Sequence, residues 1–314
     1  MILALAGGVG GARLASGLAQ ALAPGELAVV VNVGDDFEHL GLSISPDLDT
    51  VMYTLAGIHN PETGWGRAAE SWHFMEALAQ IGGDIWFRLG DRDLAVHIER
   101  TRRLRRGDTL SAITASFCAR LAIAHMVLPV SDAPVRTLVD TGAGEFSFQD
   151  YFVRQRCEPT VTGFRFEGAA EAEPSAPLMR LLETGAINGV VICPSNPWLS
   201  VAPMLAVAQL RAFIESKRVP VVAVSPIVAG GAIKGPAAKI MRELGLEASV
   251  LGVARHYGAL VDAWVMDMQD AVLKPAIERG GFAVALTDTI MSAPERSLNV
   301  ARETLSLMRR VEVR

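Results

Sequence analysis

Short apolar runs alternate with amphipathic stretches along most of the chain. The apolar runs have the length of β-strands and cover residues 2–6, 27–33, 189–193, 219–224, 263–266 and 282–286. Helical spacing of apolar side chains occurs between them, at residues 12–22, 204–215 and 237–244. Strands that are covered on both faces of a parallel sheet are apolar throughout. The pattern therefore predicts an α/β protein with a doubly wound and mostly parallel sheet.

The middle of the chain follows a different pattern. Helical spacing covers residues 68–81, 94–106 and 110–122, whereas residues 135–141 and 146–154 alternate like the two strands of a hairpin. We expect residues 66–159 to form a mainly helical insertion with a small β-hairpin. Residues 1–65 and 160–314 would then form the α/β core domain. A surface loop is expected at residues 168–177, which are rich in Ala, Glu and Pro.

Composition narrows the function classes. The 314 residues are 50% apolar, and 29 basic against 34 acidic side chains give a net charge of -5. Such a chain lacks a global positive field, and the basic run at residues 100–106 has the spacing of a solvated helix face. We therefore expect neither nucleic acid nor a membrane as partner. The start of the chain is not signal-like and no apolar run reaches roughly 18 residues, which predicts a cytoplasmic protein. The apolar content is compatible with a homodimer.

Cysteine and histidine offer no metal site or nucleophile. Cys118, Cys157 and Cys193 lie far apart in the sequence, which indicates buried thiols. The histidines show no His-x-x-x-His pair. Candidate chemistry must therefore come from other residue types.

A glycine-rich segment follows the first predicted strand directly. Gly8, Gly10 and Gly11 leave backbone N–H groups uncovered near the expected start of a helix, and Arg13 follows them. Such a helix start can bind a phosphate group or a nucleotide. The segment lacks the third glycine of the dinucleotide fingerprint and the Gly-Lys-Ser/Thr of a phosphate loop. The same glycines are also typical of tight packing between a strand and a helix, so both interpretations stay open.

Four aspartates lie within fifteen residues after the second apolar run. Asp35 and Asp36 follow the end of that predicted strand, where open α/β sheets bind their ligands, and Asp47 and Asp49 lie near a predicted helix start. Asp49 or Thr50 can also cap that helix, and Asp35 can form an Asx turn. Four carboxylates this close repel one another unless a cation or an arginine lies among them. We therefore expect them to hold Mg²⁺ together with phosphate ligands.

Two further groups carry candidate ligand-binding side chains. The first group contains Trp86, Phe87, Arg88 and Asp91. Its aromatic rings can stack on a ligand, and its arginine can bind phosphate or carboxylate. The alternative is that the group forms an ion-paired helix cap. The second group contains Ser195, Asn196, Ser225 and Lys234, which follow later predicted strands. These side chains can contribute to a nucleotide pocket at the sheet edge. Turns use the same residue types, so a purely structural role is the alternative.

Several segments resemble the motifs of one family, in the same order and over nearly the whole chain. They are Gly7-Gly8-Val9-Gly10-Gly11, Asn32-Val33-Gly34-Asp35-Asp36, Ser45-Pro46-Asp47-Leu48-Asp49-Thr50, Trp86-Phe87-Arg88-Leu89-Gly90-Asp91-Arg92-Asp93, Pro194-Ser195-Asn196-Pro197 and Ser225-Pro226-Ile227-Val228. On these segments the chain resembles the 2-phospho-L-lactate transferase family, also called CofD. The resemblance implies a Rossmann-like α/β domain with a largely helical insertion, in an enzyme that uses magnesium.

The resemblance also implies a reaction in coenzyme F420 biosynthesis. The family transfers a phospholactyl group, or phosphoenolpyruvyl in many bacteria, from a guanosine-diphosphate-activated donor to the deazaflavin Fo. The acceptor is the terminal ribityl hydroxyl of Fo, and GMP is released. A phosphoglyceryl donor is a third candidate, and the sequence does not distinguish the three acids.

Each candidate residue receives a role from this resemblance. The metal would be held by Asp35, Asp36, Asp47 and Asp49. Of these, Asp36, Asp47 and above all Asp49 would orient or deprotonate the hydroxyl. The donor diphosphate and its guanosine would contact Gly8, Gly10, Gly11, Arg13, Ser195, Asn196, Ser225 and Lys234. The Fo side would be lined by Asp35, Thr50, Trp86, Phe87, Arg88 and Asp91.

Two functions from other classes stay as alternatives. A nucleotide-sugar-binding regulator of the gluconeogenesis-factor type shares the glycine loop and the Asp-Asp pair, whereas the segment 86–93 favours the transferase. A nicotinamide-dependent oxidoreductase is suggested only by the α/β alternation and the glycines. The missing third glycine counts against it.

Overall fold

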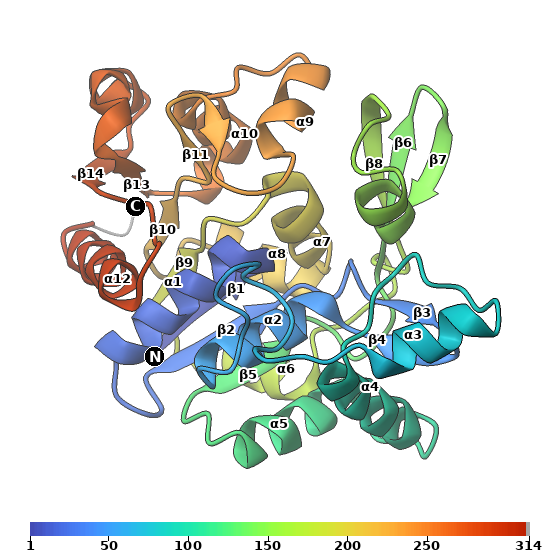
Figure 1. Ribbon diagram of the computed structural model, residues 1–314. Coiled ribbons are helices and arrows are strands. Elements are labelled where there is room, and N and C mark those ends of the chain that lie inside the picture. Colours follow the sequence, from blue (N-terminus) through green and yellow to red (C-terminus); the bar gives the residue numbers. More distant parts are fainter. Residues whose placement is uncertain (312–314) are drawn as a thin grey trace.

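A seven-stranded parallel sheet lies at the centre of the protein (Figure 1). The computed structural model describes residues 1–311. Neighbouring strands follow the order β14-β13-β10-β9-β1-β2-β5, and each neighbouring pair is parallel. The strands are β1 (Ile2–Ala6), β2 (Leu27–Val31), β5 (Met126–Pro129), β9 (Gly189–Ile192), β10 (Val221–Val224), β13 (Ala263–Asp267) and β14 (Ala283–Thr287). Helices flank this sheet, so the predicted Rossmann-like α/β fold class is confirmed.

The chain builds the sheet outwards in two directions from β1. It first adds β2 and β5 on one side, and later adds β9, β10, β13 and β14 on the other. The direction changes between β1 and β9, which are direct neighbours in the sheet. In a doubly wound sheet, the loops that follow two such strands diverge and leave a crevice at the carboxyl edge. This is where a ligand site is expected.

Two long helices cover one face of the sheet. Helix α1 (Gly8–Ala21) packs against β1 and β2, α12 (Pro294–Met308) packs against β10, β13 and β14, and the two helices contact each other. Glycine is required at Gly17 because a Cβ there would lie 2.1 Å from the Ser297 carbonyl oxygen. All five residues of β2 are buried, so its other face is covered as well.

The remaining elements connect and surround this core. The helices are α2 (Pro46–Leu55), α3 (His73–Gln80), α4 (Asp91–Leu104), α5 (Leu110–Arg120), α6 (Ala176–Glu183), α7 (Ala202–Leu205), α8 (Ala208–Glu215), α9 (Ala237–Glu243), α10 (Val250–Tyr257) and α11 (Lys274–Arg279). Short helical turns are η1 (Asp150–Arg154), η2 (Pro197–Val201), η3 (Gly258–Leu260) and η4 (Met268–Leu273). Two small hairpins pair β3 (Phe37–His39) with β4 (Leu42–Ile44) and β11 (Ile227–Val228) with β12 (Gly231–Ala232).

A second, antiparallel sheet stands apart from the main one in Figure 1. Its order is β7-β6-β8, with β6 (Arg136–Thr141), β7 (Gly144–Ser147) and β8 (Val161–Glu167). The predicted second hairpin strand, residues 146–154, is too long: β7 ends at Ser147 and η1 follows. Ser147 causes this change, because its Oγ accepts a hydrogen bond from the Asp150 backbone N–H (3.3 Å) and favours a helical turn.

Two strands pair with partners on the other side of the predicted domain boundaries. β5, within residues 66–159, pairs with β2 in the main sheet, whereas β8, beyond residue 160, pairs with β6. Both pairings join segments that are distant in sequence, which local periodicity does not detect. The division into two domains itself stays a prediction.

Three local predictions need correction. The helix expected at residues 204–215 is broken near Val207, which has an extended backbone, and the segments Pro197–Leu205 and Ala208–Glu215 meet at 93°. The helix expected to begin at residue 12 begins at Gly8, so the glycines lie within its first turn. The loop expected at residues 168–177 ends where α6 begins at Ala176, and it is anchored by buried Ala169 and Ala172.

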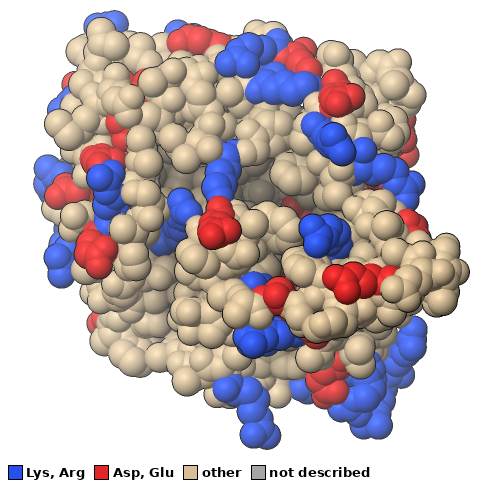
Figure 2. Space-filling model, viewed as in Figure 1, with Lys and Arg blue, Asp and Glu red and all other residues tan. Residues whose placement is uncertain are grey.

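The outer surface carries mixed charge. Figure 2 shows Lys and Arg interspersed with Asp and Glu, and a hollow near the centre of this face with basic side chains beside it. Within residues 1–311, no single helix is both long and apolar enough to cross a membrane. The bent pair Pro197–Leu205 and Ala208–Glu215 meets that test only when its two parts are taken together.

Candidate active site

The loops after β1 and β9 are tied together at the crevice. The Gly7 backbone N–H donates a hydrogen bond to Ser195 Oγ (3.0 Å), and the same hydroxyl donates to the Gly7 carbonyl oxygen (2.8 Å). These bonds use the hydroxyl proton of Ser195 and one of its two acceptor positions. With these bonds in place, a direct contact with the predicted donor has to come from an N–H or O–H group of the ligand.

The glycines of this segment have steric reasons to be glycine. Gly8 has φ of +62°, in the left-handed region. At Gly10 a Cβ would lie 2.4 Å from the Pro194 carbonyl oxygen, and at Gly11 it would lie 2.6 Å from Ser195 Oγ. The start of α1 is thus pressed against the loop after β9, as the packing interpretation expects. The first-turn N–H groups of α1 still face outward from the helix end, as a phosphate site requires.

One of those N–H groups is already bound by a carboxylate. Asp47 Oδ1 accepts a hydrogen bond from the Gly8 backbone N–H (2.7 Å). Asp47 Oδ2 and Asp35 Oδ1 both accept from Asn32 Nδ2, at 3.0 and 2.9 Å. Burial, and the charge of Asp47, raise the pKa of Asp35 well above its ordinary value, while burial raises the pKa of Asp47 to about 6. These two carboxylates share a small buried space and repel each other.

The other two aspartates have different partners. Asp36 Oδ2 accepts a hydrogen bond from Ser45 Oγ (2.8 Å), whereas its Oδ1 is buried without a partner within residues 1–311. Burial raises the pKa of Asp36 to about 7. Both oxygens of Asp49 accept hydrogen bonds from the guanidinium of Arg100. The four carboxylates therefore do not form one ligand set, and no three His, Cys, Asp or Glu side chains of the described chain are arranged to hold a metal.

Arg100 corrects the interpretation of the basic run at residues 100–106. That run was expected to be a solvated face, but Arg100 is 1% exposed. The buried face of α4 also carries Leu94, His97 and Thr101. These positions recur every three or four residues, so the periodicity of α4 contains the signal that distinguishes Arg100 from its exposed neighbours. From the sequence, either a cation or an arginine was expected to neutralise the carboxylates. For Asp49 that partner is an arginine, Arg100.

Aromatic side chains form one wall near the same crevice. Trp86 and Phe87 contact the β3 residues Phe37 and His39, with ring centroids 4.8 Å apart for Phe37 and Phe87 and 5.3 Å apart for His39 and Trp86. The Arg88 guanidinium lies 4.0 Å from the centre of the Trp72 ring. The β3–β4 hairpin that supplies Phe37 and His39 was not recognised in the sequence, because its strands have only three residues each.

Asp91 has a structural position. Its carboxylate accepts hydrogen bonds from Ser71 Oγ (2.6 Å) and from the backbone N–H groups of His73 and Phe74 (3.1 Å each). These bonds hold the start of α3, as the helix-cap interpretation expects, and they lower the pKa of Asp91 to about 2.

A cavity of about 570 Å³ brings most of the predicted site residues together. Its lining includes, among the residues predicted from the sequence, Gly8, Gly10, Asp35, Asp47, Asp49, Thr50, Trp86, Phe87, Arg88, Ser195, Asn196 and Lys234. Residues that the sequence did not single out also line it, among them Tyr53, Asp93, His97, Phe148 and Phe152. The wall is mainly apolar, with the carboxylates gathered beside the glycine segment.

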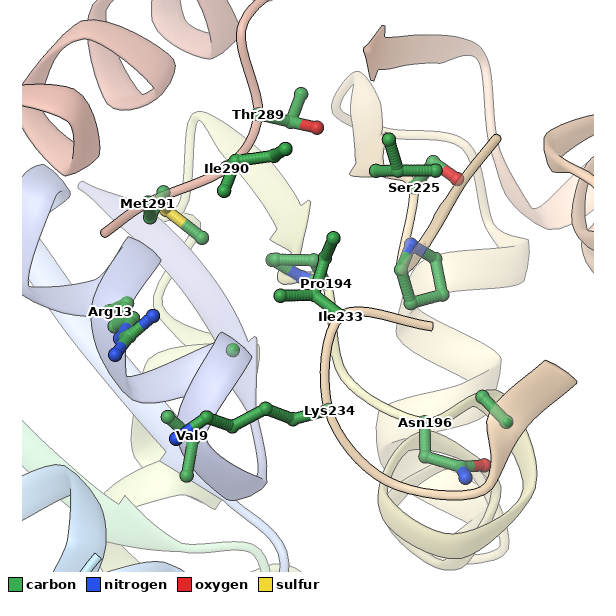
Figure 3. Close-up of a pocket in the computed structure, with 14 residues that line it drawn as sticks. Val9, Arg13, Pro194, Asn196, Ser225, Ile233, Lys234, Thr289, Ile290 and Met291 are labelled. Carbon is green, nitrogen blue, oxygen red and sulfur yellow. The ribbon is translucent and has the colours of Figure 1, made fainter. Parts of the chain in front are cut away.

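A smaller pocket of about 80 Å³ adjoins it at the start of α1 (Figure 3). Arg13 and Ser225 line this pocket, and Asn196 and Lys234 line both. Figure 3 shows Lys234 extending from its loop toward Val9 of α1. The Lys234 Nζ atom donates a hydrogen bond to the Thr63 carbonyl oxygen (2.6 Å). Of the predicted residues, Gly11, Asp36 and Asp91 line neither space.

Comparison with known proteins identifies the family. The family model described as 2-phospho-L-lactate transferase CofD matches residues 2–300. The chain belongs to the CofD family. A phosphoenolpyruvate transferase of Streptomyces griseus is 40% identical to this CofD-family chain, covering 99% of each protein. A 2-phospho-L-lactate transferase of Methanosarcina acetivorans is 35% identical, covering 98% of each. One from Methanopyrus kandleri is 39% identical, covering 97% of this chain and 96% of its own.

A solved structure shares the fold. A UPF0052-family protein of Bacillus halodurans aligns with a TM-score of 0.59 and 14% identity, covering 91% of this CofD-family chain and 92% of its own. At this identity the likeness concerns the fold alone. The family membership and its full-length relatives make the chain a member of a transferase family, as the sequence motifs predicted.

Proposed function

We propose that this CofD-family protein transfers a phospholactyl, phosphoenolpyruvyl or phosphoglyceryl group from a guanosine-diphosphate-activated donor to the terminal hydroxyl of the deazaflavin Fo. GMP would be released, and the product would belong to coenzyme F420 biosynthesis. The observation that carries the proposal is the 570 Å³ cavity, in which a helix start, paired carboxylates and an aromatic wall meet. A phosphate-bearing donor and a flat aromatic acceptor need these three features side by side.

The donor side is assigned to the start of α1 and the smaller pocket. First-turn N–H groups of α1 favour an anion, and Arg13 and Lys234 add positive charge at the opening toward Ser225. Burial and the charge of Arg13 lower the pKa of Lys234. An anion bound between Lys234 and Arg13 would relieve the repulsion between these two cations. We infer that the diphosphate lies along this edge and that the guanosine enters the smaller pocket.

The residues fit a magnesium ion, but with two carboxylates and not four. Asp35 and Asp47 are buried together, and their mutual repulsion is of the kind that a divalent cation relieves. Mg²⁺ in such enzymes is commonly held by one or two carboxylates, with phosphate oxygens and water completing its shell. When bound, Mg²⁺ would neutralise charge on the diphosphate and its leaving group. Asn32 orients both carboxylates for this role.

The acceptor side is assigned to the aromatic wall. Trp86 and Phe87 offer ring surfaces for a flat heterocycle, and Arg88 and Thr50 supply polar groups on the same cavity. Asp49, held by Arg100, lines the same cavity. This arrangement would direct the ribityl hydroxyl toward the donor phosphorus.

Product analysis tests the proposal. Purified protein would be given Fo, Mg²⁺ and each of the three guanosine-diphosphate-activated acids, and the products measured by mass spectrometry. An Fo adduct together with GMP supports the transferase and identifies the acid. Chelation of Mg²⁺ and the Asp47→Asn variant should each abolish the adduct, whereas Glu99→Gln, on the exposed face of α4, should not. Tight UDP-sugar binding without any adduct would instead favour a regulator.

A further inference from the structure

Asp93 is a carboxylate on the cavity wall that no role above employs. It lies in the first turn of α4, and its backbone N–H donates a hydrogen bond to Glu70 Oε1 (2.9 Å). The Asp93 Oδ1 atom is buried and has no hydrogen-bond partner within residues 1–311. A buried carboxylate oxygen without a partner costs free energy, which points to a ligand group that completes it.

The neighbouring aspartates differ from Asp93 in this respect. Asp49 accepts two hydrogen bonds from Arg100, and the oxygens of Asp91 are bound at the start of α3. Asp36 also has a buried oxygen without a partner, but it does not line the cavity. The sequence motifs favoured Asp49 for proton transfer, but both of its oxygens accept hydrogen bonds from Arg100. Among the carboxylate residues that line the cavity, Asp93 is the one in the described chain with a buried oxygen that accepts no well-formed hydrogen bond.

A hydroxyl donor accompanies it. Tyr53, on α2, lines the same cavity, and its buried hydroxyl makes no well-formed hydrogen bond in the described chain. The hydroxyl faces the Asp93 carboxyl, and the weak hydrogen bond between the two groups lowers the pKa of that carboxyl. A buried acceptor beside a buried donor fits one alcohol, which can donate its proton to Asp93 and accept a hydrogen bond from Tyr53.

We propose that Asp93 is the general base of the transfer and that Tyr53 positions the acceptor hydroxyl. This proposal rests on the function proposed above. The O–H bond of the acceptor breaks, and its proton moves to the Asp93 carboxylate. The acceptor oxygen forms a bond to the β-phosphorus of the donor. The bond from that phosphorus to the bridging oxygen breaks, and GMP leaves with the electron pair.

The surroundings of Asp93 suit a base that works near neutral pH. Burial raises the pKa of Asp93 to about 7, and the charges of Asp49 and Glu70 raise it further, whereas the Tyr53 hydroxyl and Arg67 oppose the rise. On α4 itself, His97 and Arg100 lie one and two turns further along. A catalytic base is most effective when its pKa lies near the working pH.

A binding experiment tests the contact without any turnover. The dissociation constants of Fo and of an Fo analogue lacking the terminal hydroxyl are measured by calorimetry with wild-type protein and with Asp93→Ala. We expect wild-type protein to prefer Fo by about tenfold or more, because hydrogen bonds to a charged group have this strength, and Asp93→Ala to lose the preference. Equal binding of both compounds by wild-type protein, or an unchanged preference in Asp93→Ala, overturns the proposal.

Kinetics then test proton transfer. Asp93→Asn should lower kcat by roughly a hundredfold or more and shift the midpoint of the acidic limb of the kcat profile away from pH 7, with the KM of the donor unchanged. Tyr53→Phe should mainly raise the KM of Fo. Glu99→Gln is the matched control on α4, and thermal unfolding verifies that each variant folds. An acidic limb whose midpoint is the same in Asp93→Asn as in wild-type protein overturns the role as base. If Fo binding depends on its hydroxyl and on Asp93 but no donor is turned over, the proposed transferase function is refuted, whereas the contact between Asp93 and the hydroxyl stands.

Discussion

The guanidinium of Arg100 and the carboxylate of Asp49 form a buried ion pair that joins α4 to α2. Arg100 is 1% exposed, its NH1 group lies 3.1 Å from Asp49 Oδ2, and His97 Nδ1 lies 3.6 Å from the same oxygen. Two helices that are distant in sequence thereby fix one side of the cavity. The pair also explains how Asp49 is accommodated close to other carboxylates.

Removal of Arg100 should be strongly destabilising. In Arg100→Met the Asp49 carboxylate stays buried without its partner, and such a loss costs about 3 kcal/mol or more of the free energy of unfolding. Urea denaturation measures this, with Arg102→Met as the control, because Arg102 forms only an exposed pair with Glu99. A loss in Arg100→Met as small as that in the control would show that the pair does not support the fold.

Removal of both charges should be milder than removal of one. The double variant Arg100→Met with Asp49→Leu leaves neither charge unpaired, so we expect its stability to exceed that of Arg100→Met. Asp49→Asn should reduce turnover by roughly a hundredfold, since it loosens the wall that holds the acceptor. Near wild-type turnover in Asp49→Asn would remove this residue from the site.

Gly10 should not tolerate even a methyl group. In Gly10→Ala the new Cβ would lie 2.4 Å from the Pro194 carbonyl oxygen, so α1 must move away from the loop after β9. We expect a loss of about 1–3 kcal/mol in stability and a higher KM for the donor. Gly142→Ala is the matched control, because a Cβ there meets nothing within 4 Å. Comparable losses in both variants would contradict the steric explanation.

The glycine segment illustrates which structural features were predictable from the sequence. The two interpretations of that segment, ligand binding and tight packing, proved compatible, because the same absence of Cβ that exposes N–H groups also lets Pro194 approach Gly10. The main strands were predicted within about two residues, since buried parallel strands carry an unmistakable apolar run. Edge strand β5 was missed because it is a four-residue run whose pairing partner lies about a hundred residues earlier.

The sequence predicted most of the residues of the candidate site, but not which side chains form ion pairs and hydrogen bonds with one another. Most of the predicted residues line one cavity, because the loops after parallel strands converge at one sheet edge. The partners of each carboxylate depend on α4, which approaches α2 only in the folded chain. Arg100 therefore looked like part of a solvated basic run, and Asp93 was not distinguished from the other polar residues of the segment 86–93.

Trp86 should contribute to acceptor binding and little to donor binding. Its ring belongs to the aromatic wall with Phe37, His39 and Phe87 and lines the larger cavity, whereas Arg13 lines only the smaller pocket. In Trp86→Leu, loss of ring stacking of about 1.4 kcal/mol should raise the KM of Fo about tenfold and leave the donor KM unchanged. Steady-state kinetics with each substrate varied in turn measure both values. A larger rise in the donor KM would reverse the assignment of the two sides.

His97 should make the protein less stable in acid. Burial lowers the pKa of His97 to about 4, with the charge of Arg100 adding to this and that of Asp49 opposing it. Below pH 6.5 the unfolded chain protonates this histidine while the folded chain resists, so stability falls as the pH drops. Between pH 7 and pH 4 this contribution is about 3 kcal/mol.

The isolated effect of His97 requires comparison of two proteins. Asp36 and Asp47, whose folded-state pKa values are raised to about 7 and about 6, bind protons more readily in the folded chain and therefore add stability over the same fall in pH. The change in unfolding free energy from pH 7 to pH 4 should consequently be more favourable in His97→Gln than in wild-type protein, by about 3 kcal/mol. Parallel curves for the two proteins would mean that folding leaves the pKa of His97 unchanged, which would contradict the effect of burial.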